Sequence, residues 1–241
     1  MEYERAVATA PPGWRRYSLK SLDLLAPDVR ERELARIPPV ERRALAAGEV
    51  EASERVTKAM FWTFVYHLEP DLWSRLASVE PVHPGVLAAI QVPRGTVVEV
   101  GAGSGRLTGH LVNAAREVVA VDLSRGLLRL LHRRLPGVRT IICAAEMLAL
   151  EDGCADLTTA CATVGPDPRV LEELKRITRT GGEVVLVSPE EPAWFEARGW
   201  RRMVFDPIPA PRHEPWIDEI FGPPDPPHEM VSLRVRRSGP P

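Results

Sequence analysis

One acidic residue and three glycines at alternate positions are the residues of this 241-residue chain whose spacing best suits chemistry. Residues 99–105 read Glu-Val-Gly-Ala-Gly-Ser-Gly and belong to a valine-rich stretch that begins at residue 97. Glycines between a buried strand and a helix let the backbone turn tightly and approach a nucleotide. A dinucleotide fingerprint would place its third glycine at Arg106, which is too large for close strand–helix packing. The pattern indicates a nucleotide-type site of another kind, with a tight turn that binds no ligand as the alternative.

A second acidic residue follows the next valine-rich run. Residues 117–121 are rich in valine, and Asp122 follows them. Residues 118–124 read Val-Val-Ala-Val-Asp-Leu-Ser. Open α/β sheets bind ligands at the carboxyl ends of their strands, and a carboxylate there can accept both hydroxyls of a ribose. The alternative is that Asp122 caps the next helix, a role that Ser124 could also fill.

The elements that position these residues alternate between strand and helix patterns. We predict strands over residues 96–100, 117–122, 138–143, 156–162, 183–188, 200–205 and 228–236. Helices are predicted over 105–115, 124–135 and 168–178. This alternation implies right-handed parallel crossovers and an α/β fold.

Helical patterns also precede the predicted sheet. They cover residues 29–37, 40–47, 52–68 and 86–90, with a short helix from residue 72, and prolines or glycine separate them. Residues 207–227 hold eight prolines and read as a long loop. We therefore expect a helical N-terminal extension or lid over 1–94 and a cofactor-binding domain over 95–241 that includes the proline-rich loop. The helices cover the sheet or close over cofactor and substrate, and we expect both uses at once.

Composition excludes several function classes. The net charge of −2 implies no nucleic-acid partner. The three cysteines lack zinc spacing, which suits a reducing compartment. No apolar run of 18 residues and no signal-peptide pattern is present, so we expect a cytoplasmic protein without stable membrane insertion, as a monomer or homodimer.

The Glu-x-Gly-x-Gly-x-Gly stretch with Asp122 resembles motif I and the ribose acid of the class I S-adenosylmethionine-dependent methyltransferases. The stretch Leu-Glu-Glu-Leu-Lys-Arg-Ile-Thr-Arg-Thr-Gly-Gly-Glu before residue 184 is similar to the family's segment after strand four. Ala-Glu-Met-Leu-Ala-Leu-Glu-Asp-Gly-Cys-Ala-Asp-Leu resembles the adenine-side segment of its ubiquinone/menaquinone-biosynthesis type. The resemblance covers about residues 96–190. It implies a Rossmann-like, seven-stranded, mostly parallel sheet whose antiparallel last strand inserts beside the sixth, with helices on both faces.

The resemblance also implies the cofactor, S-adenosylmethionine, and its binding residues. The usual adenine-side Asp is Ala144 here, so backbone groups at Ala145 or the side chain of Glu146 would meet the adenine. The full set of expected cofactor-binding residues is Glu99, Gly101, Ala102, Gly103, Gly105, Asp122, Leu123, Ala145, Glu146 and Cys161.

The best catalytic candidates are His67, Tyr66 and His83, because segments just before motif I tend to border the sulfonium in this family. A purely structural role is the alternative for each. A metal site from His67, His83 and Glu69 matches no standard spacing, so we expect no metal. We predict acceptor specificity in residues 56–84 and 207–227, which hold most of the aromatic side chains outside the core.

The family's Asn/Asp-Pro-Pro-Tyr signature after strand four is absent; Thr-Val-Gly-Pro-Asp-Pro stands there instead. Its absence argues against DNA adenine and protein glutamine as acceptors. The sequence thus predicts a methyltransferase that acts on a small molecule. The alternative is an S-adenosylmethionine-binding regulatory or scaffold protein without turnover.

Overall fold

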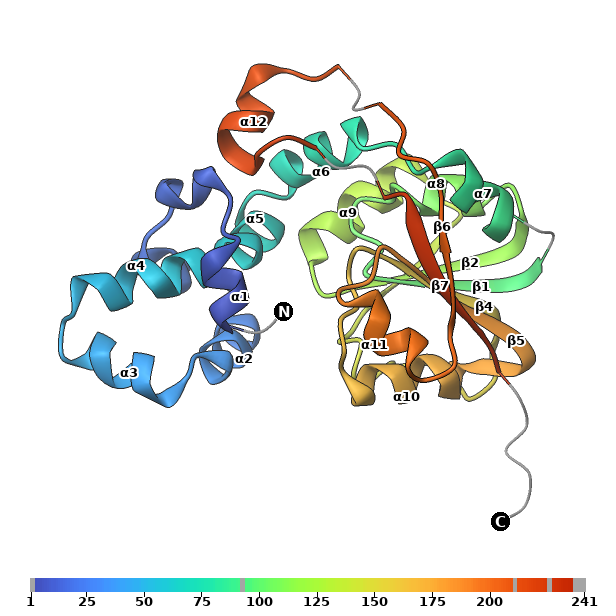
Figure 1. The fold of residues 1–241 in the computed structure, drawn as a ribbon, viewed down its shortest axis with the longest axis horizontal. Helices are drawn as coiled ribbons and strands as arrows, with labels where there is room; N and C mark the ends of the chain where they lie inside the picture. The colour runs from blue at the N-terminus through green and yellow to red at the C-terminus, as the bar shows by residue number, and fades with distance from the viewer. Residues whose placement is uncertain (1–2, 92–93, 210–211, 225–226, 236–241) are drawn as a thin grey trace, which may run out of the picture. The chain divides into compact units, whose positions relative to one another are not determined.

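The computed structural model describes residues 3–91, 94–209, 212–224 and 227–235, and the chain folds as two compact units (Figure 1). The helical unit comprises Met1–Leu76 with Arg212–Pro224, and the sheet unit comprises Ala77–Pro211 with Asp225–Pro241. This division reflects how the chain packs. The lid role expected for residues 1–94 stays a prediction.

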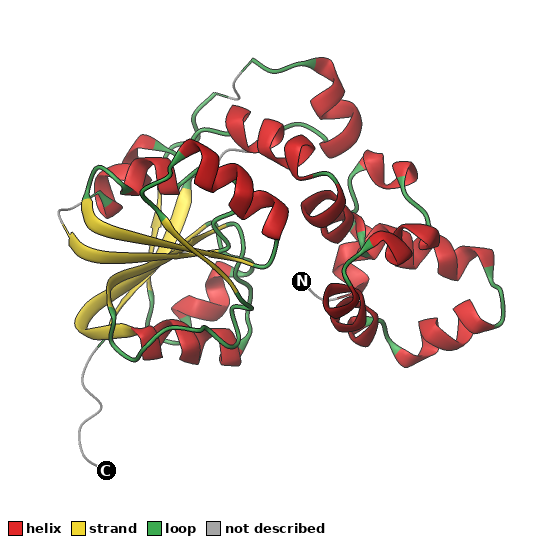
Figure 2. Cartoon of the chain, turned by 180° about the vertical axis from the view of Figure 1, so that it is seen from behind, coloured by secondary structure: helices red, strands yellow, loops and turns green. Residues whose placement is uncertain are grey.

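A seven-stranded sheet forms the centre of the sheet unit, with strand order β3-β2-β1-β4-β5-β7-β6 (Figure 2, yellow). Strands β1 to β5 pair in parallel, and β7 runs antiparallel to both β5 and β6. The predicted sheet, including the insertion of the last strand beside the sixth, is therefore confirmed. The strands are β1 Arg94–Val100, β2 Ala115–Asp122, β3 Arg139–Ile142, β4 Ala155–Cys161, β5 Thr178–Val187, β6 Arg201–Val204 and β7 Glu229–Arg234.

Helices cover both faces of this sheet because alternate strand residues point to opposite sides. Val97 packs in one core with residues of α7 (Pro84–Ile90) and α9 (Arg125–Arg134). Its neighbour Val98 packs in a second core with α10 (Pro168–Ile177) and α11 (Pro192–Glu196). Figure 1 shows α7, α8 and α9 on one side of the strands and α10 and α11 on the other. The carboxyl ends of β1, β2 and β4 thus meet at one supported edge.

The helical unit is built from short helices around its own apolar core of residues such as Val29, Ile37, Val56 and Phe64. Aromatic side chains from distant parts of the sequence meet here, since the Trp62 ring stacks on Phe221 at 5.7 Å. None of the helices in the described ranges is both long and apolar enough to cross a membrane. The helices are α1 Tyr3–Ala8, α2 Pro27–Arg36, α3 Pro39–Ala46, α4 Val50–Ala59, α5 Phe61–Leu68, α6 Pro70–Val79 and α12 Pro215–Phe221, with 3-10 turns at Pro12–Arg16 and Leu19–Leu24.

Several predicted helices are corrected by the structure. The helix expected over 105–115 is only the short α8, Thr108–Leu111, because Gly105 has a φ of +94° that no helix start can adopt. The single helix expected over 52–68 is divided into α4 and α5 at Met60, where ψ is 0°. The chain also begins with a short helix, α1, ahead of the first predicted helix.

The proline-rich stretch 207–227 is not loop throughout. It contains α12, which starts at Pro215, a position where a missing N–H and a fixed φ suit a helix. Residues 210–211 and 225–226 of this stretch lie outside the described residues, as does Arg236 of the predicted last strand.

Candidate cofactor site

The turn after β1 takes a conformation that depends on its glycines. Gly101 has a φ of +71°, and a Cβ at this position would collide with the side chain of Thr163. Gly103 also has a positive φ, and its N–H points to the next strand, where it bonds to Asp122. The backbone therefore runs close to the sheet edge from Gly101 to Gly105, with Ala102, Gly103 and Gly105 buried in it.

Asp122 lies at the carboxyl end of β2 and holds this turn. Its Oδ2 accepts a 2.8 Å hydrogen bond from the N–H of Gly103, and its Oδ1 accepts a 2.7 Å bond from the N–H of Ser124. Burial raises the pKa of the Asp122 carboxyl, and these N–H groups counteract part of that rise. The helix cap is supplied by Ser124, whose Oγ accepts from the N–H of Leu127. A carboxylate offers about four acceptor positions, so capacity for a ligand hydroxyl remains beside these N–H groups.

Glu99, the acidic residue of the glycine pattern, is buried with 1% of its surface exposed. The Thr108 hydroxyl donates a 2.5 Å hydrogen bond to its Oε2, which ties the end of β1 to the start of α8. Burial raises the pKa of the Glu99 carboxyl to about 8. At neutral pH this side chain is therefore mostly protonated, so the site carries less negative charge than its sequence suggests.

Two buried hydroxyls at this edge lack a hydrogen-bond partner among the described residues: Ser104 Oγ and Thr159 Oγ1. Ser104 belongs to the glycine turn, and Thr159 lies in β4 directly beside Glu99 in the strand register. Buried hydroxyls are costly unless they are hydrogen-bonded, and a polar ligand would satisfy them. Together with the free acceptor positions of Asp122, they fit a cofactor that carries ribose and amino-acid groups, such as S-adenosylmethionine.

Cys161 and Leu123 are also among the expected cofactor-binding residues. Cys161 is buried at the end of β4, and its Sγ accepts a 3.2 Å hydrogen bond from Arg106 Nη2. Burial raises the pKa of the Cys161 thiol, so the sulfur stays protonated. Arg106 also forms a 2.6 Å ion pair with Glu80. Leu123 is half-buried immediately after Asp122.

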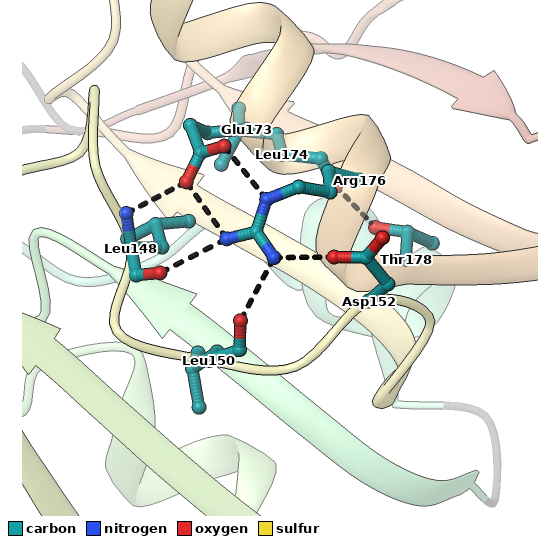
Figure 3. Close-up of polar contacts among 7 residues, drawn as sticks. All are labelled: Leu148, Leu150, Asp152, Glu173, Leu174, Arg176 and Thr178. Carbon is teal, nitrogen blue, oxygen red and sulfur yellow. Dashed lines mark hydrogen bonds and ion pairs between the residues drawn. The ribbon is translucent and has the colours of Figure 1, made fainter.

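The expected adenine side is the segment between β3 and β4. Ala145 and Glu146 are half-buried there, in a turn closed by the Met147 N–H and the Ala144 carbonyl at 3.2 Å. The residues after this turn are held by Arg176 of α10 (Figure 3). Sequence reasoning missed Arg176, because an arginine on the polar side of an amphipathic helix reads as a solvated charge. The 24 to 28 residues that separate it from its partners left no local signal.

The three predicted catalytic residues occupy different environments. His83 caps α7: its Nδ1 accepts from the N–H of Gly85 at 2.9 Å, so its Nε2–H donates to the Asp206 carbonyl at 2.8 Å. Its ring also stacks on Phe205.

The other two candidates, His67 and Tyr66, lie in α5 of the helical unit, where Tyr66 packs edge-on against Trp73 at 4.8 Å. Burial lowers the pKa of His67, which favours its neutral form. The structure thus brings Gly103 and Asp122 into contact at the sheet edge, and the cofactor-binding roles of the other candidates and the catalytic roles of His67, Tyr66 and His83 stay predictions. No group of three His, Cys, Asp or Glu suited to a metal ion occurs in the described parts of the chain.

Comparison with known proteins agrees with this geometry. Residues 97–182 match the family model described as a methyltransferase domain. An uncharacterised methyltransferase of Mycobacterium tuberculosis is 38% identical over 93 residues, which are 38% of this chain and 38% of that protein. A demethylmenaquinone methyltransferase of Renibacterium salmoninarum is 31% identical over 106 residues, 43% of this chain and 45% of that protein. The matched part thus spans less than half the length of either relative.

A solved structure shows the same fold at low identity. It is the complex between the Haloferax volcanii Trm112 methyltransferase activator and a methyltransferase, and the match has a TM-score of 0.53 and 16% identity. The match covers 70% of this chain and 98% of that chain. Residues 97–182 thus match a methyltransferase domain, and the strand order of the sheet and the glycine turn held by Asp122 agree with that match.

Proposed function

We propose that this chain is an S-adenosylmethionine-dependent methyltransferase that acts on a small-molecule acceptor. The observation that carries the proposal is the 2.8 Å bond between Asp122 and the N–H of Gly103. It joins a ribose-side carboxylate to the turn after Glu99, at the carboxyl edge of the sheet where α/β folds bind ligands.

The cofactor, when bound, supplies a methyl group on a positively charged sulfur, and the protein binds and orients the reactants. Asp122 would accept hydrogen bonds from the ribose hydroxyls, and the backbone of residues 101–105 would lie along the ribose and methionine parts. Ser104 and Thr159 would find partners for their buried hydroxyls. Ala145 and Glu146 would border the adenine. Holding the acceptor atom in line and excluding water is the protein's main contribution to rate.

Two observations support a small-molecule acceptor. The chain has a net charge of −2 and no basic excess for a nucleic-acid partner. Half-buried aromatic rings from both expected acceptor segments cluster within the helical unit, where Phe221 contacts Trp62 and Trp216. Small-molecule pockets are mostly apolar and aromatic. The name of one relative, a demethylmenaquinone methyltransferase, is consistent with such an acceptor. We further propose that the protein acts in the cytoplasm as a monomer or homodimer.

Thermal unfolding with candidate cofactors tests the cofactor assignment. A ligand that binds only the native state raises the melting temperature, by an amount that grows with its concentration. S-adenosylmethionine and S-adenosylhomocysteine should raise the melting temperature by several degrees when their concentration is about 1–100 times an assumed Kd of about 10 μM. NAD and NADH should not raise it. A shift with NAD alone would contradict the proposal.

Turnover separates the enzyme from a scaffold that only binds the cofactor. Transfer of a labelled methyl group from S-adenosylmethionine to a panel of phenols, quinols, amines and carboxylic acids should yield at least one product. His67→Ala and His83→Ala should then lower transfer while the affinity for S-adenosylhomocysteine stays within about twofold, because neither residue is assigned to the cofactor. Cofactor binding without any product would instead favour the regulatory alternative.

A further inference from the structure

Arg176 uses its whole guanidinium group to hold the segment between β3 and β4 (Figure 3). Its Nε donates to Glu173 Oε1 at 2.7 Å, and its Nη2 donates to Glu173 Oε2 at 2.8 Å and to the Leu148 carbonyl at 2.9 Å. Its Nη1 donates to the Leu150 carbonyl at 2.8 Å and to Asp152 Oδ1 at 2.6 Å. All five N–H donors of a guanidinium are thereby engaged.

The segment is also held through its other backbone groups. Glu173 Oε2 accepts a 2.7 Å hydrogen bond from the N–H of Leu148, so both polar backbone groups of that residue are bound. The Arg176 carbonyl accepts from the N–H of Gly153 at 2.8 Å. The Leu148 side chain is buried with 4% exposure in the core beneath. Residues 148–153 are therefore fixed to α10 by hydrogen bonds and by packing.

This segment continues directly from Ala144–Glu146, the residues assigned above to the adenine. Ala144 has no polar side chain, so recognition of the adenine would depend on where the backbone and Glu146 are placed. Their placement is set on one side by β3 and on the other by residue 148, which Arg176 and Glu173 hold. No N–H of Arg176 remains for a ligand, so Arg176 acts through the segment and not by contact.

We infer that Arg176 is a positioning residue that sets the affinity for the adenine part of the cofactor; this inference rests on the proposed function. The shape of the guanidinium matters more than its charge. A lysine has one ammonium with three donors and no planar fork, so it cannot bind the Glu173 carboxylate with two parallel bonds and also reach two carbonyls. Arg176→Lys therefore preserves the positive charge and removes most of the hydrogen bonds that the guanidinium makes.

Isothermal titration calorimetry at 25 °C tests this inference on the full chain, with S-adenosylhomocysteine and, separately, adenosine as titrants. Arg176→Met should weaken binding of both ligands at least tenfold and by similar factors, since both carry the adenine. Arg176→Lys should weaken both by at least threefold. The matched control is Lys175→Met: Lys175 lies on the same helix, next to Arg176, and its Nζ pairs with Glu172.

Ligand affinity measured on folded protein distinguishes a positioning role of Arg176 from a contribution to stability alone. Thermal melts accompany each titration, and titrations are made well below each melting temperature. If Arg176→Met does not fold, Arg176→Lys carries the test. Wild-type affinity in the folded Arg176 variants would overturn the inference, as would weaker binding of S-adenosylhomocysteine with unchanged binding of adenosine, or an equal loss in Lys175→Met. A wild-type protein that binds neither ligand would refute the proposed function and this inference with it.

Discussion

The turn after β1 lies at the edge of the sheet where the segment after β3 begins, and the two stretches are held by opposite kinds of side chain. The turn is held by Asp122, a carboxylate that accepts backbone N–H groups. The segment is held by Arg176, a guanidinium that donates to backbone carbonyls. An ionised carboxylate keeps acceptor positions for a ligand after it has bound the backbone, whereas a guanidinium with five bonds has no donor left. Asp122 can therefore hold the turn and bind a ligand at the same time. Arg176 can only hold its segment, so any contact between that segment and a ligand must come from other atoms.

The two regions should respond to pH in opposite directions. Glu99 has a pKa of about 8 in the native state against an ordinary value of 4.5, because it is buried. Between these pH values the native protein keeps a proton that the unfolded chain has lost. The free energy of unfolding should therefore fall as pH rises from about 5 to 8, by up to about 1.4 kcal/mol per pH unit. Glu99→Gln, which is neutral throughout, should flatten this decline.

The comparison variant for that experiment is Glu173→Gln. The Arg176 guanidinium holds the pKa of Glu173 below its ordinary value, so the contribution of Glu173 to stability is present above pH 4.5 and is lost as pH falls further. Urea unfolding from pH 3 to 9 should show that Glu99→Gln alters the upper part of the pH profile and Glu173→Gln the lower part. Identical profiles for the two variants and the wild type would show that the regions do not differ in this way.

Removing the ribose-side carboxylate should produce the next largest effect. Asp122→Ala leaves the N–H groups of Gly103 and Ser124 without their acceptor and removes the proposed partner of the ribose hydroxyls. The affinity for S-adenosylhomocysteine should fall by about 1–3 kcal/mol, roughly five- to 160-fold, when measured by calorimetry.

Asp156→Ala is the matched control for Asp122→Ala. Asp156 also accepts a backbone N–H from the first strand, that of Thr96 at 2.7 Å, but it does so at the amino end of β4. This variant should lower stability and leave the affinity within about twofold, because ligands of α/β sheets bind at the opposite edge. Equal affinities in Asp122→Ala and wild type would place the ribose elsewhere.

The smallest expected effect is a gain. Ala144→Asp restores the carboxylate that the resembling family carries at this position, and a charged acceptor for the adenine amino group should tighten S-adenosylhomocysteine binding by about 1 kcal/mol, roughly fivefold. Ala149→Asp adds the same charge to an exposed position of the same segment and should leave the affinity unchanged. A loss of affinity in Ala144→Asp alone would mean that this turn does not face the adenine amino group.

The parts of this structure that sequence could predict are those with local causes. Valine-rich runs predicted the strands, and glycine spacing with Asp122 predicted the proposed cofactor edge, because strand burial and turn geometry depend on neighbouring residues. The short α8 was missed because the consequence of a positive φ at Gly105 depends on the chain path into β2. Arg176 and α12 were missed for another reason: their roles come from partners far along the chain, such as Leu148 for Arg176 and Trp62 for Phe221.

The place of β7 in the sheet has a consequence for the newborn chain. Ribosomes deliver the chain from its N-terminus, so β1, β2 and β4 have all emerged once residue 161 is free, long before Glu229–Arg234. Until β7 is synthesised, one edge of β5 has no strand to pair with. The same holds for β6, whose pairing in the described sheet is with β7. A product that stops before residue 229 would keep the strands of the proposed cofactor edge and display an open strand edge, the kind of surface that drives aggregation. We therefore expect chains that lack β7 to be less soluble than the full-length chain.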